Sequence, residues 1–146
     1  MRKLTLERRV REILRGASDD LTAWKLPTDL RLTGNGVVHG EPMPADFMGY
    51  RHNDGKVFFV ECKEVERNTL PLGKKPGLSP FQMQAMVEAK RHGVRYVLVW
   101  GRPSLERFAV RVDGEDEGFS LAWPSGEFLL AERQLPRALL GAIMGG

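Results

Sequence analysis

A segment over residues 56–63 that is almost continuously apolar until its end is the feature that most restricts how this chain can fold. The segment reads Lys-Val-Phe-Phe-Val-Glu-Cys-Lys, and the turn signal Asn53-Asp54-Gly55 comes directly before it. A strand that is apolar at consecutive positions is typical of the middle of a sheet that is covered on both faces. Because Asn-Asp-Gly between apolar segments favours a tight turn, we predict a β-hairpin over residues 45–63 with a central second strand.

Helices are predicted on either side of this hairpin. In residues 4–15, four apolar side chains share one helical stripe, and Gly16 follows as a stop signal; they are Leu6, Val10, Ile13 and Leu14. A second helix begins with Ser79 as N-cap, Pro80 in the first turn and Gln82 as the capping-box partner, and it ends near His92 before Gly93. Residues 135–144 predict a terminal helix.

The other segments predict strands and loops. Residues 96–100 are an apolar strand, and shorter strands are expected near 106–113, 118–123 and 127–130. Residues 17–43 are expected to be an irregular loop anchored by Trp24, because Gly34, Gly36 and Gly40 precede two prolines. Residues 66–78 are expected to form a basic loop. The order of elements indicates an α/β fold, a mixed central sheet flanked by helices, in a single domain over residues 1–146.

Composition excludes several classes of protein. Lys and Arg number 22 and Asp and Glu 19, so the net charge of +3 permits an anionic partner without requiring one. The single cysteine, Cys62, excludes an internal disulfide and a cysteine-based zinc site. No apolar run is long enough to cross a membrane and no signal-peptide core follows Met1. We therefore expect the cytoplasm, bacterial or that of the host if a phage encodes the chain.

Three charged side chains are predicted to converge at one end of the hairpin. Glu61 and Lys63 are two residues apart in a strand, so they share a face and lie roughly 7 Å apart along the backbone. With a two-residue loop, Asp46 on the partner strand lies opposite Lys63, and with a four-residue loop it lies opposite Glu61. Any even loop places Asp46 on their face, whereas an odd loop or a bulge would not.

Such a group suggests a divalent cation. Two carboxylates and a lysine are costly to bury without a partner, and Mg²⁺ or Mn²⁺ prefers oxygen ligands. A cation there would support phosphodiester hydrolysis, with the lysine stabilising charge in the transition state. The alternative is a surface ion pair between Glu61 and Lys63, which the apolar run before them disfavours.

The pattern resembles the PD-(D/E)xK nuclease superfamily, and within it the Holliday junction resolvases of the RecU and archaeal Hjc types. Pro44-Ala-Asp46 resembles the first half-motif, with one extra residue between Pro and Asp, and Glu61-Cys62-Lys63 resembles the second. The resemblance covers roughly residues 44–100 and the first helix. It implies a restriction-endonuclease-like core and an endonuclease that resolves four-way DNA junctions by symmetric, metal-dependent cleavage.

The resemblance also implies roles for individual residues. Asp46 and Glu61 would be metal ligands, the Cys62 carbonyl a further ligand, and Lys63 the catalytic lysine. A glutamate of the first helix would complete the site. Glu7 lies about 75° from the centre of the apolar stripe and Glu12 about 145°, so Glu7 is the better candidate. Its alternative is an ordinary helix N-terminal glutamate.

Gln82 is expected either near the attacking water or only in its capping box, with Gln84 as the substitute if the helix register differs. Basic residues are predicted to contact DNA phosphates; they are Arg67, Lys74, Lys75, Arg8, Arg9, Arg11 and Arg51. Symmetric cleavage of a junction implies a two-fold homodimer. The alternatives are a nicking, restriction or repair nuclease of the same superfamily, or a non-catalytic DNA-binding module.

Overall fold

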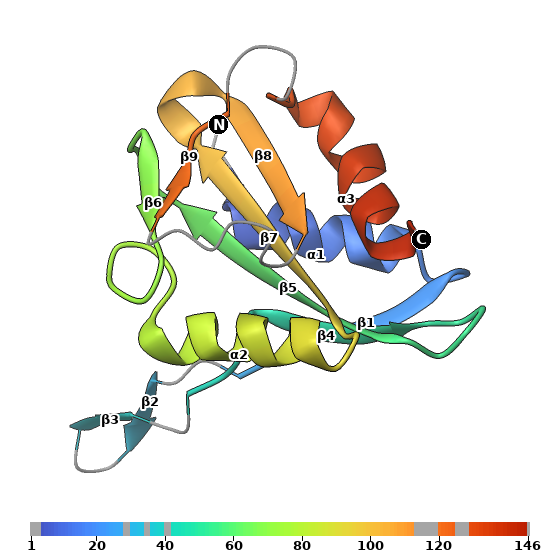
Figure 1. The fold of residues 1–146 in the computed structure, drawn as a ribbon, viewed down its shortest axis with the longest axis horizontal. Coiled ribbons are helices and arrows are strands. Elements are labelled where there is room, and N and C mark those ends of the chain that lie inside the picture. The colour runs from blue at the N-terminus through green and yellow to red at the C-terminus, as the bar shows by residue number, and fades with distance from the viewer. Residues whose placement is uncertain are drawn as a thin grey trace.

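The computed structural model describes residues 4–27, 30–33, 36–39, 42–112, 120–124 and 129–145. Its centre is a mixed five-stranded sheet with the strand order β1-β4-β5-β7-β8 (Figure 1). The strands are β1 (Leu21–Lys25), β4 (Phe47–Arg51), β5 (Val57–Glu64), β7 (Arg95–Arg102) and β8 (Arg107–Val112). Three helices flank the sheet: α1 (Leu6–Gly16), α2 (Pro80–Arg91) and α3 (Leu135–Met144). The predicted α/β class, a mixed central sheet flanked by helices, is confirmed.

Each face of the sheet carries its own apolar core. Helices α1 and α3 bury Val10 and Leu139 against Phe58 and Val60 of β5 on one face. On the other face, Met86 of α2 packs with residues of β7. Full burial of one such side chain contributes about 1.5–3 kcal/mol. The predicted central position of residues 56–63 is confirmed, because β5 lies third of the five strands and is covered on both faces.

The β4–β5 hairpin has the longer of the two even loops considered above. Phe47 pairs with Val60 and Tyr50 with Val57, in antiparallel register. Continuing this register past Phe47 places Asp46 opposite Glu61, which corresponds to a loop over residues 52–55. Gly55 adopts a left-handed φ of 72° in the turn, a conformation that glycine adopts without strain.

Helix α2 begins as the sequence predicts. The Ser79 hydroxyl accepts the Gln82 backbone N–H at 3.1 Å, and Gln82 Oε1 accepts the Ser79 N–H at 3.0 Å, which completes the capping box. The helix ends at Arg91, with His92 as the C-cap and Gly93 at a φ of 73°. Through α2, β5 connects to its parallel neighbour β7, so the first turn of α2 lies over the end of β5.

The predicted irregular loop over 17–43 is wrong in two places. Residues 21–25 form β1, which pairs antiparallel with β4, and β2 (Leu30–Thr33) pairs with β3 (Gly36–His39) in a separate hairpin. Trp24 does not anchor the segment, because 46% of it is exposed. Leu21, only 2% exposed, is the residue of β1 that enters the core.

The predicted loop over 66–78 also contains a strand. β6 (Thr69–Pro71) pairs with β9 (Ser120–Ala122), which confirms part of the strand expected near 118–123. Residues 127 and 128 of the strand expected over 127–130 lie outside the described residues, and Leu130 forms an isolated bridge to Phe108 of β8. Single 3₁₀ turns, η1 (Pro103–Leu105) and η3 (Glu132–Gln134), precede β8 and α3.

Gly77 is required where the chain from β6 returns to α2. A Cβ at Gly77 would lie 1.8 Å from the Pro71 carbonyl oxygen, which is backbone and cannot yield easily. We expect Gly77→Ala to lower the free energy of unfolding by about 3 kcal/mol. Gly141→Ala is the matched control, because no atom lies within 4 Å of its Cβ and alanine suits a helix. Chemical denaturation should show the control unchanged or stabilised by about 1 kcal/mol; an unaffected Gly77→Ala would contradict the close approach.

Candidate active site

Asp46 is fixed at the mouth of the hairpin by three neighbouring segments. Its Oδ2 accepts the backbone N–H of Cys62 at 2.8 Å, and its own carbonyl accepts the Leu26 N–H at 2.8 Å. The Tyr96 hydroxyl, from β7, donates to the Pro44 carbonyl at 2.6 Å. The segment before β4 is therefore held by β1, β5 and β7, and the Asp46 carboxylate faces β5.

Glu61 is the most deeply buried charged side chain of the described chain, with 2% of its surface exposed. Its Oε2 accepts the Gln82 amide at 2.8 Å and lies 3.2 Å from Lys63 Nζ. Its Oε1 is buried without a hydrogen-bond partner. The predicted convergence of Asp46, Glu61 and Lys63 is therefore present in the structure, and Gln82 joins them.

Burial gives these carboxyl groups unusual acidities. Desolvation, together with the negative charge of Asp46, raises the pKa of Glu61 to about 8, against the opposing effect of Lys63. Desolvation also raises the pKa of Asp46, although the Cys62 N–H favours its ionised form. Burial raises the pKa of the Cys62 thiol well above its ordinary value, and this side chain packs toward the α1 core. Cys62 therefore borders the site with its backbone rather than its thiol.

The donor set fits a hard divalent cation held mainly by water and two carboxylates. An orphaned, buried oxygen on Glu61 beside a second carboxylate is an arrangement that a cation stabilises. Mg²⁺ commonly binds proteins through one or two carboxylates and keeps several waters. Over the residues that the structure describes, no cluster of three or more His, Cys, Asp or Glu side chains is arranged around a metal position. The protein ligands would thus be Asp46 and Glu61, and the Cys62 carbonyl stays a prediction.

Gln82 closes its capping box and also contacts Glu61, while its place near an attacking water stays a prediction. Its Oε1 closes the capping box while its Nε2 donates to Glu61, so one side chain links the start of α2 to β5. Gln84, the substitute, is exposed. The helix register is therefore the predicted one.

Truncating Gln82 should cost more stability than truncating its capping partner. Ser79→Ala removes only the cap and should cost about 1 kcal/mol. Gln82→Ala removes its half of the box and the donor to a buried carboxylate, so we expect about 2 kcal/mol. Equal losses in urea denaturation would indicate that the bond to Glu61 contributes nothing.

Glu7 forms an ion pair with Lys25, a residue that no pattern in the sequence indicates. Lys25, the last residue of β1, places Nζ 3.1 Å from Glu7 Oε1 and donates to the Leu26 carbonyl at 2.8 Å. Both charges act on Asp46, Glu7 raising and Lys25 lowering its pKa. Glu12 pairs instead with Arg8 on the exposed side of α1, at 4.0 Å. Of the two glutamates, Glu7 is therefore the one that faces the site, and its role there stays a prediction.

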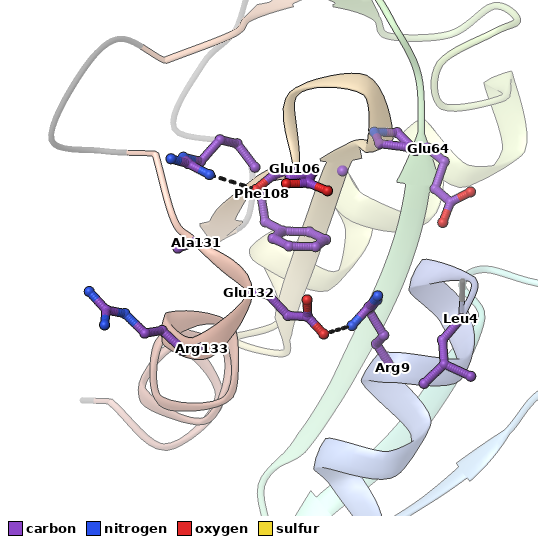
Figure 2. Close-up of a pocket in the computed structure, with 11 residues that line it drawn as sticks. Leu4, Arg9, Glu64, Glu106, Phe108, Ala131, Glu132 and Arg133 are labelled. Atoms are coloured by element: carbon purple, nitrogen blue, oxygen red, sulfur yellow. Dashed lines mark hydrogen bonds and ion pairs between the residues drawn. The ribbon is translucent and has the colours of Figure 1, made fainter. Parts of the chain in front are cut away.

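The predicted DNA-contacting cations fall into two groups. Five are exposed: Arg8, Arg11, Arg67, Lys74 and Lys75. Arg51 is buried at 8% exposure, bonded to Asp54 and to the α3 carbonyls of Ile143 and Met144, so its predicted surface role is wrong. Arg9 is paired with Glu132 and lines a pocket of about 570 Å³ between α1, β8 and the segment before α3 (Figure 2).

No family model and no curated protein sequence matches the chain. Among solved structures, the chain is similar to Hjc of Archaeoglobus fulgidus, described as a Holliday junction resolvase from an archaeal hyperthermophile, with 14% identity and a TM-score of 0.47. The match covers 86% of this chain and 97% of that one. In the described part of the chain, no helix has the length and apolar character needed to cross a bilayer.

Proposed function

We propose that this protein is a divalent-metal-dependent endodeoxyribonuclease of the PD-(D/E)xK type that acts on four-way DNA junctions. The observation that supports it is the cross-strand pair of Asp46 and Glu61, with Lys63 and Gln82 on the buried carboxylate. The alternative of a surface ion pair does not account for a glutamate that is 2% exposed with an orphaned oxygen. The motif resemblance and this geometry point to the same residues.

Each residue has a distinct task in this proposal. Asp46 and Glu61 would hold Mg²⁺ or Mn²⁺, which supplies neutralisation of phosphate charge and activation of the attacking water. Lys63, one-fifth exposed beside Glu61, presents its ammonium to the charge that develops on the phosphate. Gln82 holds Glu61 Oε2, so Oε1, which has no hydrogen-bond partner, would be the oxygen left to bind the cation. Tyr96 fixes the Pro44 segment, so it positions Asp46 without touching substrate.

DNA would be held through its phosphates. Lys74 and Lys75 lie in the exposed part of the loop that leads into α2, the helix that carries Gln82. Arg8 and Arg11 are exposed on α1, next to Glu7. Such cations position a duplex without reading its sequence. Because a junction presents two equivalent strands, we further propose a two-fold homodimer.

The test compares cleavage of a labelled four-way junction and of a linear duplex with the same arms, in Mg²⁺ and in EDTA. Paired nicks in the junction alone, absent in EDTA, are the expected result. Equal cleavage of the duplex would support the proposed nuclease activity but contradict its specificity for four-way junctions. Tight junction binding without cleavage in Mg²⁺ or Mn²⁺ would leave a binding module.

Glu7 and Glu12 offer a matched pair on one helix. Glu7 is within electrostatic range of Asp46, whereas Glu12 faces solvent. We expect Glu7→Gln to raise the Mg²⁺ concentration needed for half-maximal cleavage by roughly 10- to 100-fold, as loss of a supporting group does at metal sites. Glu12→Gln should leave it within twofold. Measuring the cleavage rate over a range of Mg²⁺ concentrations distinguishes the two variants. Identical curves for both variants would mean that Glu7 does not support metal binding.

A further inference from the structure

An exposed aromatic surface lies on the same face of the sheet as Asp46. Side chains two apart on β4 share a face, so Met48 and Tyr50 lie on the Asp46 face. Their partners on β1, Trp24 and Thr22, lie on that face too, because directly paired residues do. Trp24 is 46% and Tyr50 40% exposed, although both lie within strands of the central sheet.

The His52 ring, which contacts Tyr50, is held in place by two hydrogen bonds. His52 is fixed by the Thr22 hydroxyl, 2.7 Å from its Nε2, and by the Asp19 carbonyl, 3.0 Å from its Nδ1. The His52 ring in turn contacts Tyr50, with centroids 5.8 Å apart. Because these hydrogen bonds fix the His52 ring, the Tyr50 ring beside it stays exposed to solvent, although an aromatic residue is usually buried. We call Trp24, Tyr50 and His52 the aromatic platform.

Cations lie around the β1 edge from the platform. Trp24 lines a small pocket of about 190 Å³ at this edge together with Arg11 and Arg15, both exposed on α1, and the pocket opens on the α1 side of the sheet, because Ala23 and Phe47 also line it. Lys25, the next residue of β1, is 20% exposed and points toward Glu7. An exposed ring at a sheet edge, with two exposed arginines lining the same edge pocket, is suited to a ligand that combines flat bases with phosphates, rather than to a purely apolar partner.

The platform is continuous with the proposed active site. Met48, the cross-strand partner of Trp24, is two residues from Asp46, roughly 7 Å along the strand, and Tyr50 is roughly 13 Å away. These spacings are within the reach of the first few nucleotides beside a cleaved phosphate. Helix α2 packs on β7, toward the other edge of the sheet, which leaves Trp24 and Tyr50 accessible.

We propose that the aromatic platform stacks unpaired bases of single-stranded DNA next to the cleaved phosphate, with Arg11 and Arg15 contacting phosphates of the same strand where it passes the β1 edge. This inference rests on the nuclease proposed above and specifies its substrate: a branched DNA whose bases are unpaired close to the cleavage position, as at an opened branch point. Stacking of this kind tolerates any base, because every base presents a flat face.

The test measures binding of a fluorescein-labelled twelve-residue oligothymidylate and of a duplex of the same length, in EDTA. Trp24→Ala and Tyr50→Ala should each weaken oligothymidylate binding by about tenfold and change duplex binding by less than twofold. Trp24→Phe should restore most of the affinity. Leu105→Ala is the matched control, since Leu105 is 45% exposed and lies in η1, outside the platform. Unlabelled oligothymidylate should also quench the intrinsic tryptophan fluorescence of wild type but not that of Trp24→Phe.

Two outcomes would overturn the inference: unchanged oligothymidylate affinity in both alanine variants, or equal losses for single strand and duplex. If Trp24→Ala instead abolishes self-association in sedimentation, the face is a contact between copies of the chain and the inference is also wrong. Its failure is separable from that of the nuclease. If the alanine variants bind oligothymidylate like wild type while Asp46→Asn is inactive, only the platform inference fails. If Asp46→Asn is fully active, only the proposed metal site fails.

Discussion

Asp46→Asn is expected to lower metal-dependent DNA cleavage by roughly 10³-fold or more. The substitution retains the shape of the side chain and an oxygen for the Cys62 N–H, but it removes one of the two negative charges that face the proposed cation position. A cation contributes several kcal/mol of charge stabilisation in such reactions, which corresponds to a rate loss of this size. Single-turnover cleavage of a labelled junction at saturating enzyme measures the chemical step without interference from binding.

Lys63→Met and Glu12→Gln complete this experiment. Lys63 Nζ lies 3.2 Å from Glu61 Oε2, so losing it removes a donor at the reacting phosphate, with an expected rate loss of about 10²–10³-fold. Glu12→Gln removes an exposed acid that pairs only with Arg8 among the ion pairs recorded for α1, and it should cleave like wild type. Cleavage by Asp46→Asn at more than a tenth of the wild-type rate would rule out Asp46 as a metal ligand.

The parts of the site that could be predicted from the sequence depend on local rules. Strand alternation puts Glu61 and Lys63 on one face whatever the rest of the chain does. A hairpin with an even loop then brings Asp46 to the same face, and the structure has the four-residue version. The capping box at Ser79 is local as well, so the start of α2 was predicted to the residue.

The parts that were missed depend on pairings between distant segments. Strand β1 is five residues long and lies at a sheet edge, so its apolar pattern is weak, and only its pairing with β4 brings Lys25 near Asp46. Arg51 follows the pattern of an exposed hairpin end, yet the end of α3 covers it and accepts its hydrogen bonds. The sequence around an edge strand does not specify which strand pairs with it, and the sequence around a turn does not specify which helix packs over it.

Gln82 shows why two interpretations of one residue need not exclude each other. The capping box uses its Oε1 and backbone N–H, and the bond to Glu61 uses its Nε2. From the sequence, the capping pattern was sufficient to account for Gln82. The second bond became visible only once β5 and α2 were placed together, because it joins residues 21 positions apart.

Glu61→Gln is expected to stabilise the metal-free protein at pH 8 while abolishing cleavage. Burial raises the pKa of Glu61 to about 8 in the folded chain, against an ordinary value of 4.5. Between these values the folded chain keeps a proton that the unfolded chain has released. Stability from this group is therefore fully present below about pH 4.5, and it falls by about 1.4 kcal/mol per pH unit as the pH rises toward 8.

Glutamine removes that pH dependence because it has no proton to lose, and it fills almost the same volume beside Gln82 and Lys63. Wild type without metal should lose on the order of 4 kcal/mol of unfolding free energy between pH 5 and 8, whereas Glu61→Gln should lose much less. Urea denaturation in EDTA at four pH values measures how the unfolding free energy of each protein changes with pH. Glu12→Gln, an exposed acid, should follow wild type.

Added Mg²⁺ supplies the second arm of this experiment. A cation that binds ionised carboxylates competes with the proton on Glu61, so its stabilising effect should grow as the pH rises from 6 to 8. The same addition should leave Glu61→Gln and Asp46→Asn nearly unchanged, because each lacks one of the two carboxylates. A pH slope in Glu61→Gln equal to that of wild type would mean that Glu61 is ionised in the folded protein. A Mg²⁺ effect independent of pH would mean that the cation binds away from the Asp46–Glu61 pair, and the hydrolytic site would then have to be sought elsewhere in the chain.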